Sequence, residues 1–229
     1  MIINRSHLFA LLTVFSCGIL ADQPLTYDRI NLTVSAGRDV ENDLLVSVMY
    51  AQAEGNNPSR LSDDVNRAVG RAVEKAKLDP RIQVQTLEYS TAPVYRKQTL
   101  SGWRVRQSIR LESADGAALG ELIGELQSSL AVDSISYTIS PARLKVIEDE
   151  LIGEAIAAFS ARAQSVSSAI GRKGYRLVQM DINTPGHLPQ PRQLQRMAMA
   201  MSEDAAPPTL EAGSRRVEVH INAMIELNP

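Results

Sequence analysis

Cysteine and histidine are scarce in this chain, and their scarcity excludes several kinds of site. The 229 residues include one cysteine, Cys17, and three histidines, of which His187 and His220 follow the N-terminal segment. These two histidines have no close ligand spacing and no cysteine partner, so a zinc pattern is missing. No serine stands in a Gly-x-Ser-x-Gly turn. We therefore expect a protein that is not an enzyme, with no cofactor and no catalytic residue.

Aromatic residues and an excess of one charge are also lacking. Aromatics make up 4% of the chain, and the formal net charge is only -2. The core must therefore be mainly aliphatic. Acids and bases are spread along the chain, unlike the clustered basic surface of nucleic-acid-binding proteins. We expect no nucleic acid partner.

One long apolar run is present, from residue 8 to residue 20, and it predicts where the protein works. A polar start with a single cation, Arg5, precedes the run, and the small residue Ala21 follows it. This layout is typical of a secretory signal peptide over residues 1–21, with cleavage after Ala21. The run is shorter than the about 20 apolar residues of a membrane span. We therefore expect a mature protein, residues 22–229, that acts outside the cytoplasm.

Cys17 offers a second interpretation of the same segment. The preceding Val14-Phe15-Ser16 resembles a lipoprotein signal loosely, because bulky Phe15 stands where a small or β-branched residue is usual. Acylation of Cys17 would anchor the protein to the envelope by a lipid chain. Contact with a membrane is expected only in that case.

Hydrophobic periodicity predicts an α+β fold, with antiparallel sheet and helices packed on one face. Strands are expected at residues 30–36, 44–50, 81–89, 102–111, 132–139, 175–182 and 217–225. The first two strands are expected to form a hairpin through Gly37-Arg38-Asp39, and residues 91–100 are expected to be a loop. Residues 184–213, rich in proline and alanine, are interpreted as a mobile loop. The length suits one domain or two lobes that divide near residue 115.

Helices are expected to begin at Pro58, Gly116 and Pro141, the first and third after the capping residues Asn57 and Ser140. The third helix is the longest and lies in the C-terminal half. It ends at Gly171, a residue type that accepts the left-handed conformation. At about 45 Å, this helix either spans the molecule or packs on another subunit.

A methionine run is the best candidate for metal chemistry. Met197, Met199 and Met201 form a Met-x-Met-x-Met pattern. Thioethers are soft ligands that suit Cu(I), and exposed methionines absorb oxidant by reversible sulfoxide formation. The alternative is a loosely packed apolar segment, since methionine fills irregular gaps.

A row of arginines and a group of aromatic residues have plainer alternatives. Arg104, Arg106 and Arg110 share one face of a predicted strand. They either receive an anionic ligand or another subunit, or they form a solvated face paired with cross-strand acids. Trp103, with Tyr89 and Tyr95 near it in sequence, is expected to anchor a core or an interface.

Several segments in this order resemble the SIMPL family of exported bacterial proteins. They are Val34-Ser35-Ala36-Gly37 in the first strand, Val84-Gln85-Thr86, Pro93-Val94-Tyr95, Ser101 to Gln107, Val132 to Tyr137, and Glu154-Ala155-Ile156 with Ala161-Arg162-Ala163 in the long helix. In the family, tyrosine is commoner than tryptophan at the position of Trp103. The resemblance extends from about Arg29 to Leu227.

The resemblance implies one SIMPL-like domain over residues 22–229, located in the periplasm or elsewhere in the cell envelope. It also implies a link to oxidative and other envelope stress and a tendency to form homo-oligomers. No agreed activity, cofactor or catalytic residue comes with the family. The expected function is therefore that of a self-assembling, non-catalytic envelope protein, with metal handling or oxidant absorption by the methionine run as the alternative.

Overall fold

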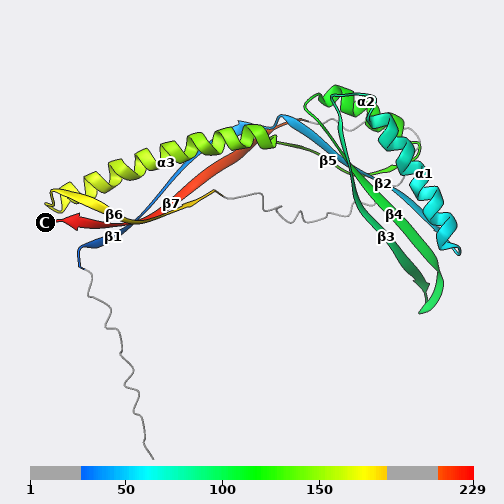
Figure 1. The fold of residues 1–229 in the computed structure, drawn as a ribbon, viewed down its shortest axis with the longest axis horizontal. Coiled ribbons are helices and arrows are strands. Elements are labelled where there is room, and N and C mark those ends of the chain that lie inside the picture. The colour runs from blue at the N-terminus through cyan, green and yellow to red at the C-terminus, as the bar shows by residue number, and fades with distance from the viewer. Residues whose placement is uncertain (1–26, 185–210) are drawn as a thin grey trace, which may run out of the picture.

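The structure is a computed structural model that describes residues 27–184 and 211–229. The predicted signal peptide at 1–21 and nearly all of the predicted loop at 184–213 lie outside the described residues. The described residues form two antiparallel sheets and three helices. Figure 1 shows that each sheet, with its helices, forms a separate lobe, so that the molecule is elongated.

The terminal lobe contains the strands nearest both ends of the chain. Its sheet has three strands in the order β1-β7-β6: β1 (Arg29–Glu41), β7 (Ser214–Asn228) and β6 (Gly174–Asn183). Helix α3 (Pro141–Ala169) lies along one face and contacts all three strands. Alternate residues of β7, from Val217 to Leu227, are buried in the same core cluster as α3. This alternation is the period of a strand with one covered face.

The middle lobe has a four-stranded sheet in the order β3-β4-β2-β5. Its elements are β2 (Leu44–Gly55), α1 (Pro58–Ala76), β3 (Gln83–Arg96), β4 (Thr99–Ser113), α2 (Gly116–Leu126) and β5 (Ala131–Thr138). Both helices bury apolar side chains in one cluster with β2 and β4. The opposite face of this sheet carries arginines and glutamates.

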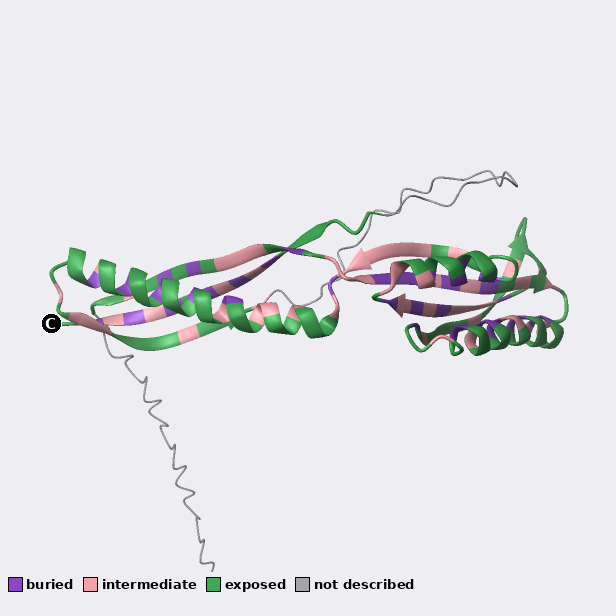
Figure 2. Ribbon diagram, turned by 90° about the horizontal axis from the view of Figure 1, so that it is seen from above, coloured by how far each residue is buried: buried purple, intermediate pink, exposed green. Residues whose placement is uncertain are grey.

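The two cores are separate. Apart from Val46, the buried apolar residues fall into two clusters with no member in common, one in each lobe. Figure 2 shows buried positions on the helices and strands of both lobes. The predicted α+β class is confirmed, with helices on one face of each antiparallel sheet and the long helix in the C-terminal half.

The predicted helix ends are confirmed, since they depend on local chemistry. The Asn57 side chain accepts a hydrogen bond from the Arg60 amide at 3.2 Å, and Pro58 opens α1. The Ser140 hydroxyl accepts from the Arg143 amide at 3.4 Å at the start of α3. Gly171 follows the end of α3 with a φ of 76°. In the part of the chain that the structure describes, no helix has the length and apolar character needed to cross a membrane.

The expected hairpin between the first two strands is wrong. β1 does not turn at Gly37 but continues to Glu41, and it pairs with β7 from Arg29↔Glu226 to Glu41↔Ser214. A Cβ at Gly37 would lie 3.0 Å from the Val217 carbonyl oxygen, so this glycine permits close packing within the sheet. β1 and β2 therefore belong to different sheets.

The expected loop at residues 91–100 is also wrong. β3 runs through Pro93 to Arg96, and β4 begins at Thr99, so that the connection has two residues. These residues, Lys97 and Gln98, have φ angles of 47° and 65°, the signs of a type I′ turn. Pro93 is tolerated because β3 is an edge strand, which needs no amide donor on its outer side.

The chain crosses between the lobes at two places other than residue 115. One crossing follows β1 at Asn42-Asp43, and the other follows β5 at Ile139-Ser140. Residue 115 lies inside the middle lobe, where Asp115 caps α2. The terminal lobe is thus discontinuous in sequence, because it takes its first strand from before the middle lobe and the rest from after it.

Candidate functional site

Most of the residues that the sequence suggests for metal binding or lipidation lie outside the residues that the structure describes. Met197, Met199, Met201, His187 and Cys17 all lie outside the described residues. Within residues 27–184 and 211–229, no group of three or more His, Cys, Asp or Glu side chains gathers in a way that would hold a metal ion. Function must therefore be sought in the surfaces of the two lobes.

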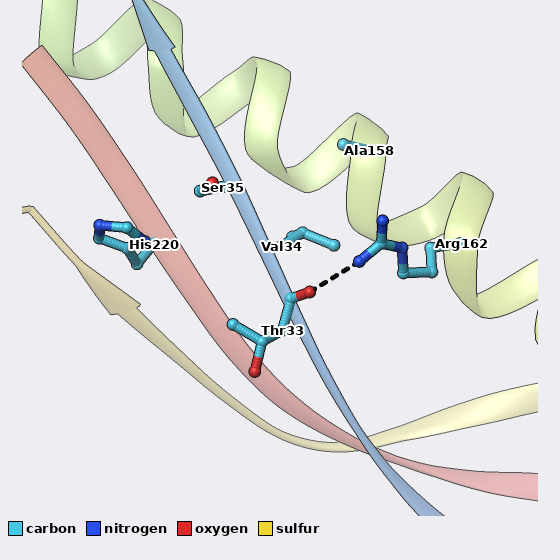
Figure 3. A pocket seen from close by; sticks show the side chains of 6 residues that line it. All are labelled: Thr33, Val34, Ser35, Ala158, Arg162 and His220. Atoms are coloured by element: carbon cyan, nitrogen blue, oxygen red, sulfur yellow. Dashed lines mark hydrogen bonds between the residues drawn. The ribbon is translucent and has the colours of Figure 1, made fainter.

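A shallow hollow of about 260 Å³ lies beside β1 in the terminal lobe. Figure 3 shows Arg162 of α3 reaching Thr33, whose carbonyl oxygen accepts a hydrogen bond from Nη1 at 3.0 Å. His220 lies on the neighbouring strand β7, opposite Ser35. Its Nε2 is 3.9 Å from a carboxylate oxygen of Glu218. The hollow contains a helix-to-strand contact but no paired nucleophile and base.

A second hollow, of about 530 Å³, lies where the end of α1 meets α2. Apolar side chains, including Ile82 and Leu122, line part of it. Four of its five charged residues form pairs: Lys75 lies 2.8 Å from Glu125, and Arg81 lies 2.6 Å from Asp79. The Lys75–Glu125 pair connects the two helices, and the remaining charge, on Glu121, does not make a convergent set of polar groups of the kind that orients a small ligand.

The predicted arginine row lies on the uncovered face of the middle sheet. Arg104 pairs with Glu54 at 2.5 Å, and Arg110 pairs with Glu112 at 2.9 Å. Arg106 pairs with Asp133 at 2.7 Å and stacks over the Tyr50 ring at 3.7 Å. The geometry matches the alternative of a solvated face with paired acids, since each guanidinium already has a carboxylate.

Two other arginines join separate elements. Arg38 of β1 pairs with Glu150 and Glu154 of α3 at 2.8 and 2.5 Å, and the hydrogen bond that it donates to Glu154 is the main cause that raises the pKa of Arg38. Arg81 binds Asp79 and Asp115, each at 2.6 Å. Its side-chain hydrogen bond is the main cause that lowers the pKa of Asp79. The shifted pKa values of Arg38 and Asp79 are explained by hydrogen bonds within the two clusters, without a bound ligand.

The junction between the lobes is held by Asp43. Its carboxylate accepts hydrogen bonds from the Ser140 amide at 2.7 Å and from the Ser140 hydroxyl at 2.8 Å. Its own amide donates to the Thr138 carbonyl at 3.0 Å. Partial burial raises the pKa of Asp43, but the Ser140 hydrogen bonds and the Arg143 charge outweigh it, so that the pKa lies below 3.8.

Beside Asp43, Asn42 ties the junction to the segment before β7. Its amide donates to the Gly213 carbonyl at 3.1 Å, and its side-chain nitrogen donates to the Ala212 carbonyl at 2.7 Å. Both crossings and the start of β7 are therefore hydrogen-bonded at one place.

The outer edge of β6 exposes apolar side chains. β6 is the last strand of its sheet, and Leu177, Val178 and Ile182 are all exposed there. Leu177 and Ile182 pair with buried residues of β7. They therefore lie on the same face of the sheet as α3, but at the edge strand they remain exposed. An apolar edge strand of this kind is a template for pairing with another strand.

The three aromatic residues grouped by sequence have different environments. Trp103 is half-buried and packs against the middle core. Tyr89 and Tyr95 are exposed on β3, and Tyr95 stands opposite exposed Leu100 near the turn. Trp103 fits the predicted core role, whereas the two tyrosines are not core residues.

Sequence reasoning missed Asp43 and the β6 edge. The signal for the edge was the adjacent pair Leu177-Val178, which breaks the alternation of a strand with one covered face. Asp43 gave no signal, because its partner Ser140 is 97 positions away.

Comparison with known proteins identifies the family of the chain. No curated protein matches it. A family model does match, over residues 30–225, and it is described as SIMPL, a protein of unknown function (DUF541). The matched range includes every helix of the structure and nearly all of its strands. The chain therefore belongs to the SIMPL family.

Proposed function

We propose that this protein is an exported, non-catalytic component of the cell envelope that assembles with copies of itself. The N-terminal pattern at residues 1–21 supports export to the periplasm, and cleavage after Ala21 would release a free protein. The proposed link to oxidative and other envelope stress is taken from what the resemblance to the SIMPL family implies. The proposal of assembly rests on one structural observation, the exposed apolar edge of β6.

The other three edge strands are poorer templates for pairing. The β1 edge is engaged by Arg162, which donates to the Thr33 carbonyl. β3 contains Pro93, and its register with β4 shifts at two places. β5 has 8 residues against 10 in β6, and β5 and β6 each have one register shift. Proline, bulges, short strands and covering side chains are the usual protections of sheet edges.

Self-pairing of β6 gives a closed and symmetric dimer. Antiparallel pairing of β6 with β6 of a second copy places a twofold axis perpendicular to the sheet. The result is one continuous sheet of six strands, three from each copy, with both α3 helices on the same face. Leu177 and Ile182 of both copies then cover one another beside the helices.

We expect this interface to be sensitive to charge. The double variant Leu177→Lys with Ile182→Lys puts four like charges into the dimer interface, so the dissociation constant should rise at least about a hundredfold. Size-exclusion chromatography with light scattering at micromolar concentration measures the mass. Val146→Lys is the matched control, because Val146 is 56% exposed on α3, against 47% for Leu177 and 41% for Ile182 on β6.

Two outcomes separate the parts of this proposal. A wild-type protein that is monomeric at micromolar concentration contradicts self-assembly altogether. A wild-type oligomer that the β6 lysines leave intact contradicts the interface but not assembly.

The methionine run supports a second function, periplasmic metal handling or oxidant absorption. Met197, Met199 and Met201 supply soft ligands of the kind that bind Cu(I). Cu(I) titration of the wild type and of a variant with all three changed to alanine is the test, and we expect the variant to lose affinity about tenfold or more. Equal Cu(I) affinity of the two proteins would remove the methionine run from consideration.

A further inference from the structure

The β3–β4 hairpin projects beyond the helices of the middle lobe and ends in an apolar pair. Figure 1 shows the paired strands extending past α1 and α2. Near the turn, Tyr95 stands directly opposite Leu100, and these side chains are 62% and 50% exposed. Neither belongs to the middle core or packs against it. The pair is therefore available to a partner outside the chain.

The same tip is basic. Arg96 and Lys97 lie at its end, and the sequence from Tyr89 to Trp103 contains no acidic residue. Along β4, the first arginine with an ion-pair partner is Arg104, which lies beyond the tip and binds Glu54. The tip therefore combines two apolar side chains with two cations and favours an anionic, partly apolar partner.

The two residues of the turn have a strained backbone, and one of them is a lysine. Lys97 and Gln98 both have positive φ, at 47° and 65°. Asn-Gly is the usual pair for a two-residue turn of this type, because these residues accept positive φ at less cost. A lysine in this position is unfavourable for the turn, and it places a positive charge at the end of the hairpin.

We propose that this tip docks on the surface of a bilayer that carries anionic headgroups. A tyrosine ring and a leucine side chain partition into the headgroup and upper acyl region, while arginine and lysine reach lipid phosphates. A protein partner is less well suited, because a specific interface needs about 800 Å² from each side, and the tip offers few side chains. A bilayer requires no complementary shape. Assembly through β6 would add avidity but is not required.

Co-sedimentation with vesicles tests the proposal. All proteins carry Cys17→Ala, so that no acyl chain contributes. We expect binding to vesicles that contain phosphatidylglycerol and much weaker binding to phosphatidylcholine alone. Arg96→Gln with Lys97→Gln should weaken the partition coefficient about fivefold for each cation removed. Tyr95→Ser with Leu100→Ser should weaken it about tenfold.

Controls from the same lobe remove equivalent groups elsewhere. Leu78→Ser and Arg71→Gln change exposed residues that lie away from the hairpin tip, and both should bind like the parent protein. Circular dichroism before and after heating checks that each variant is folded. Failure of the parent to sediment with phosphatidylglycerol vesicles overturns the proposal, as does equal binding by the tip variants. Crosslinking from a photoreactive residue at position 95 to one defined protein, without vesicle binding, identifies a protein partner instead.

Discussion

Replacing Phe159 with alanine should lower the free energy of unfolding of the terminal lobe by about 3 to 4 kcal/mol. Phe159 is 3% exposed, at the centre of the buried stripe of α3. Its ring meets the Tyr175 ring edge to face, with the ring centres 6.3 Å apart. Alanine leaves a cavity between α3 and the first residues of β6. The loss is large beside the 5 to 15 kcal/mol that stabilises a typical domain.

Hydrogen exchange of the Phe159→Ala variant locates the effect. Because the two cores share no residue, protection should fall in β1, β6 and β7 while β2 and β4 stay protected. Val146→Ala, at an exposed position of α3, serves as the control and should change stability by less than about 0.5 kcal/mol. Equal loss of protection in both lobes would show that they unfold as one unit.

Asp43→Ala should destabilise the protein by about 2 to 3 kcal/mol at neutral pH. The variant loses two charge-assisted hydrogen bonds to Ser140, at 2.7 and 2.8 Å. It also frees the hydroxyl that caps α3 at Arg143, so the first turn of the helix should fray. Urea unfolding followed by circular dichroism measures the change.

This contribution should depend on pH. The pKa of Asp43 in the folded protein lies below its ordinary value of 3.8. The stabilisation is therefore complete above about pH 4 and is lost as the pH falls through the folded-state pKa. The difference in stability between the wild type and Asp43→Ala should shrink in that acidic range.

Asp43→Asn is the matched control for the junction. It keeps one acceptor oxygen and the shape of the side chain but has no charge, so an intermediate loss is expected, with less dependence on pH. A difference between wild type and Asp43→Ala that stays constant down to pH 2 would contradict the role assigned to the carboxylate.

The local parts of the fold could be predicted from the sequence. Asn57 with Pro58 and Ser140 with Pro141 mark helix starts, because a cap bonds an amide only three residues away. The apolar stripe of α1 is likewise a periodic signal within one element. The hairpin tip was missed because Pro93 is typical of loops, and because Lys97-Gln98 is not one of the residue pairs that predict a two-residue hairpin turn.

The candidate surfaces were harder to predict than the elements that carry them. A strand pattern shows that Leu177 and Ile182 are apolar, but not that β6 is the last strand of its sheet. In the same way, the sequence groups Tyr95 with Trp103 as an anchor of a core or an interface, whereas in the structure Tyr95 is exposed on a hairpin that extends past the helices. Exposure depends on what covers a strand, and that is a property of the whole fold.

The sequence by itself determined which residues of the most regular strands and helices face a core. The alternation of β7 from Val217 to Leu227 is an example, because successive side chains point to opposite faces. Only the tertiary structure decided which strands pair, as when β1 joined β7 near the other end of the chain instead of its neighbour β2. The physical reason is that pairing uses backbone amides and carbonyls, which are the same in every strand. The partner of each strand, the identity of the edge strands and the junction between the lobes therefore depend on packing between distant segments.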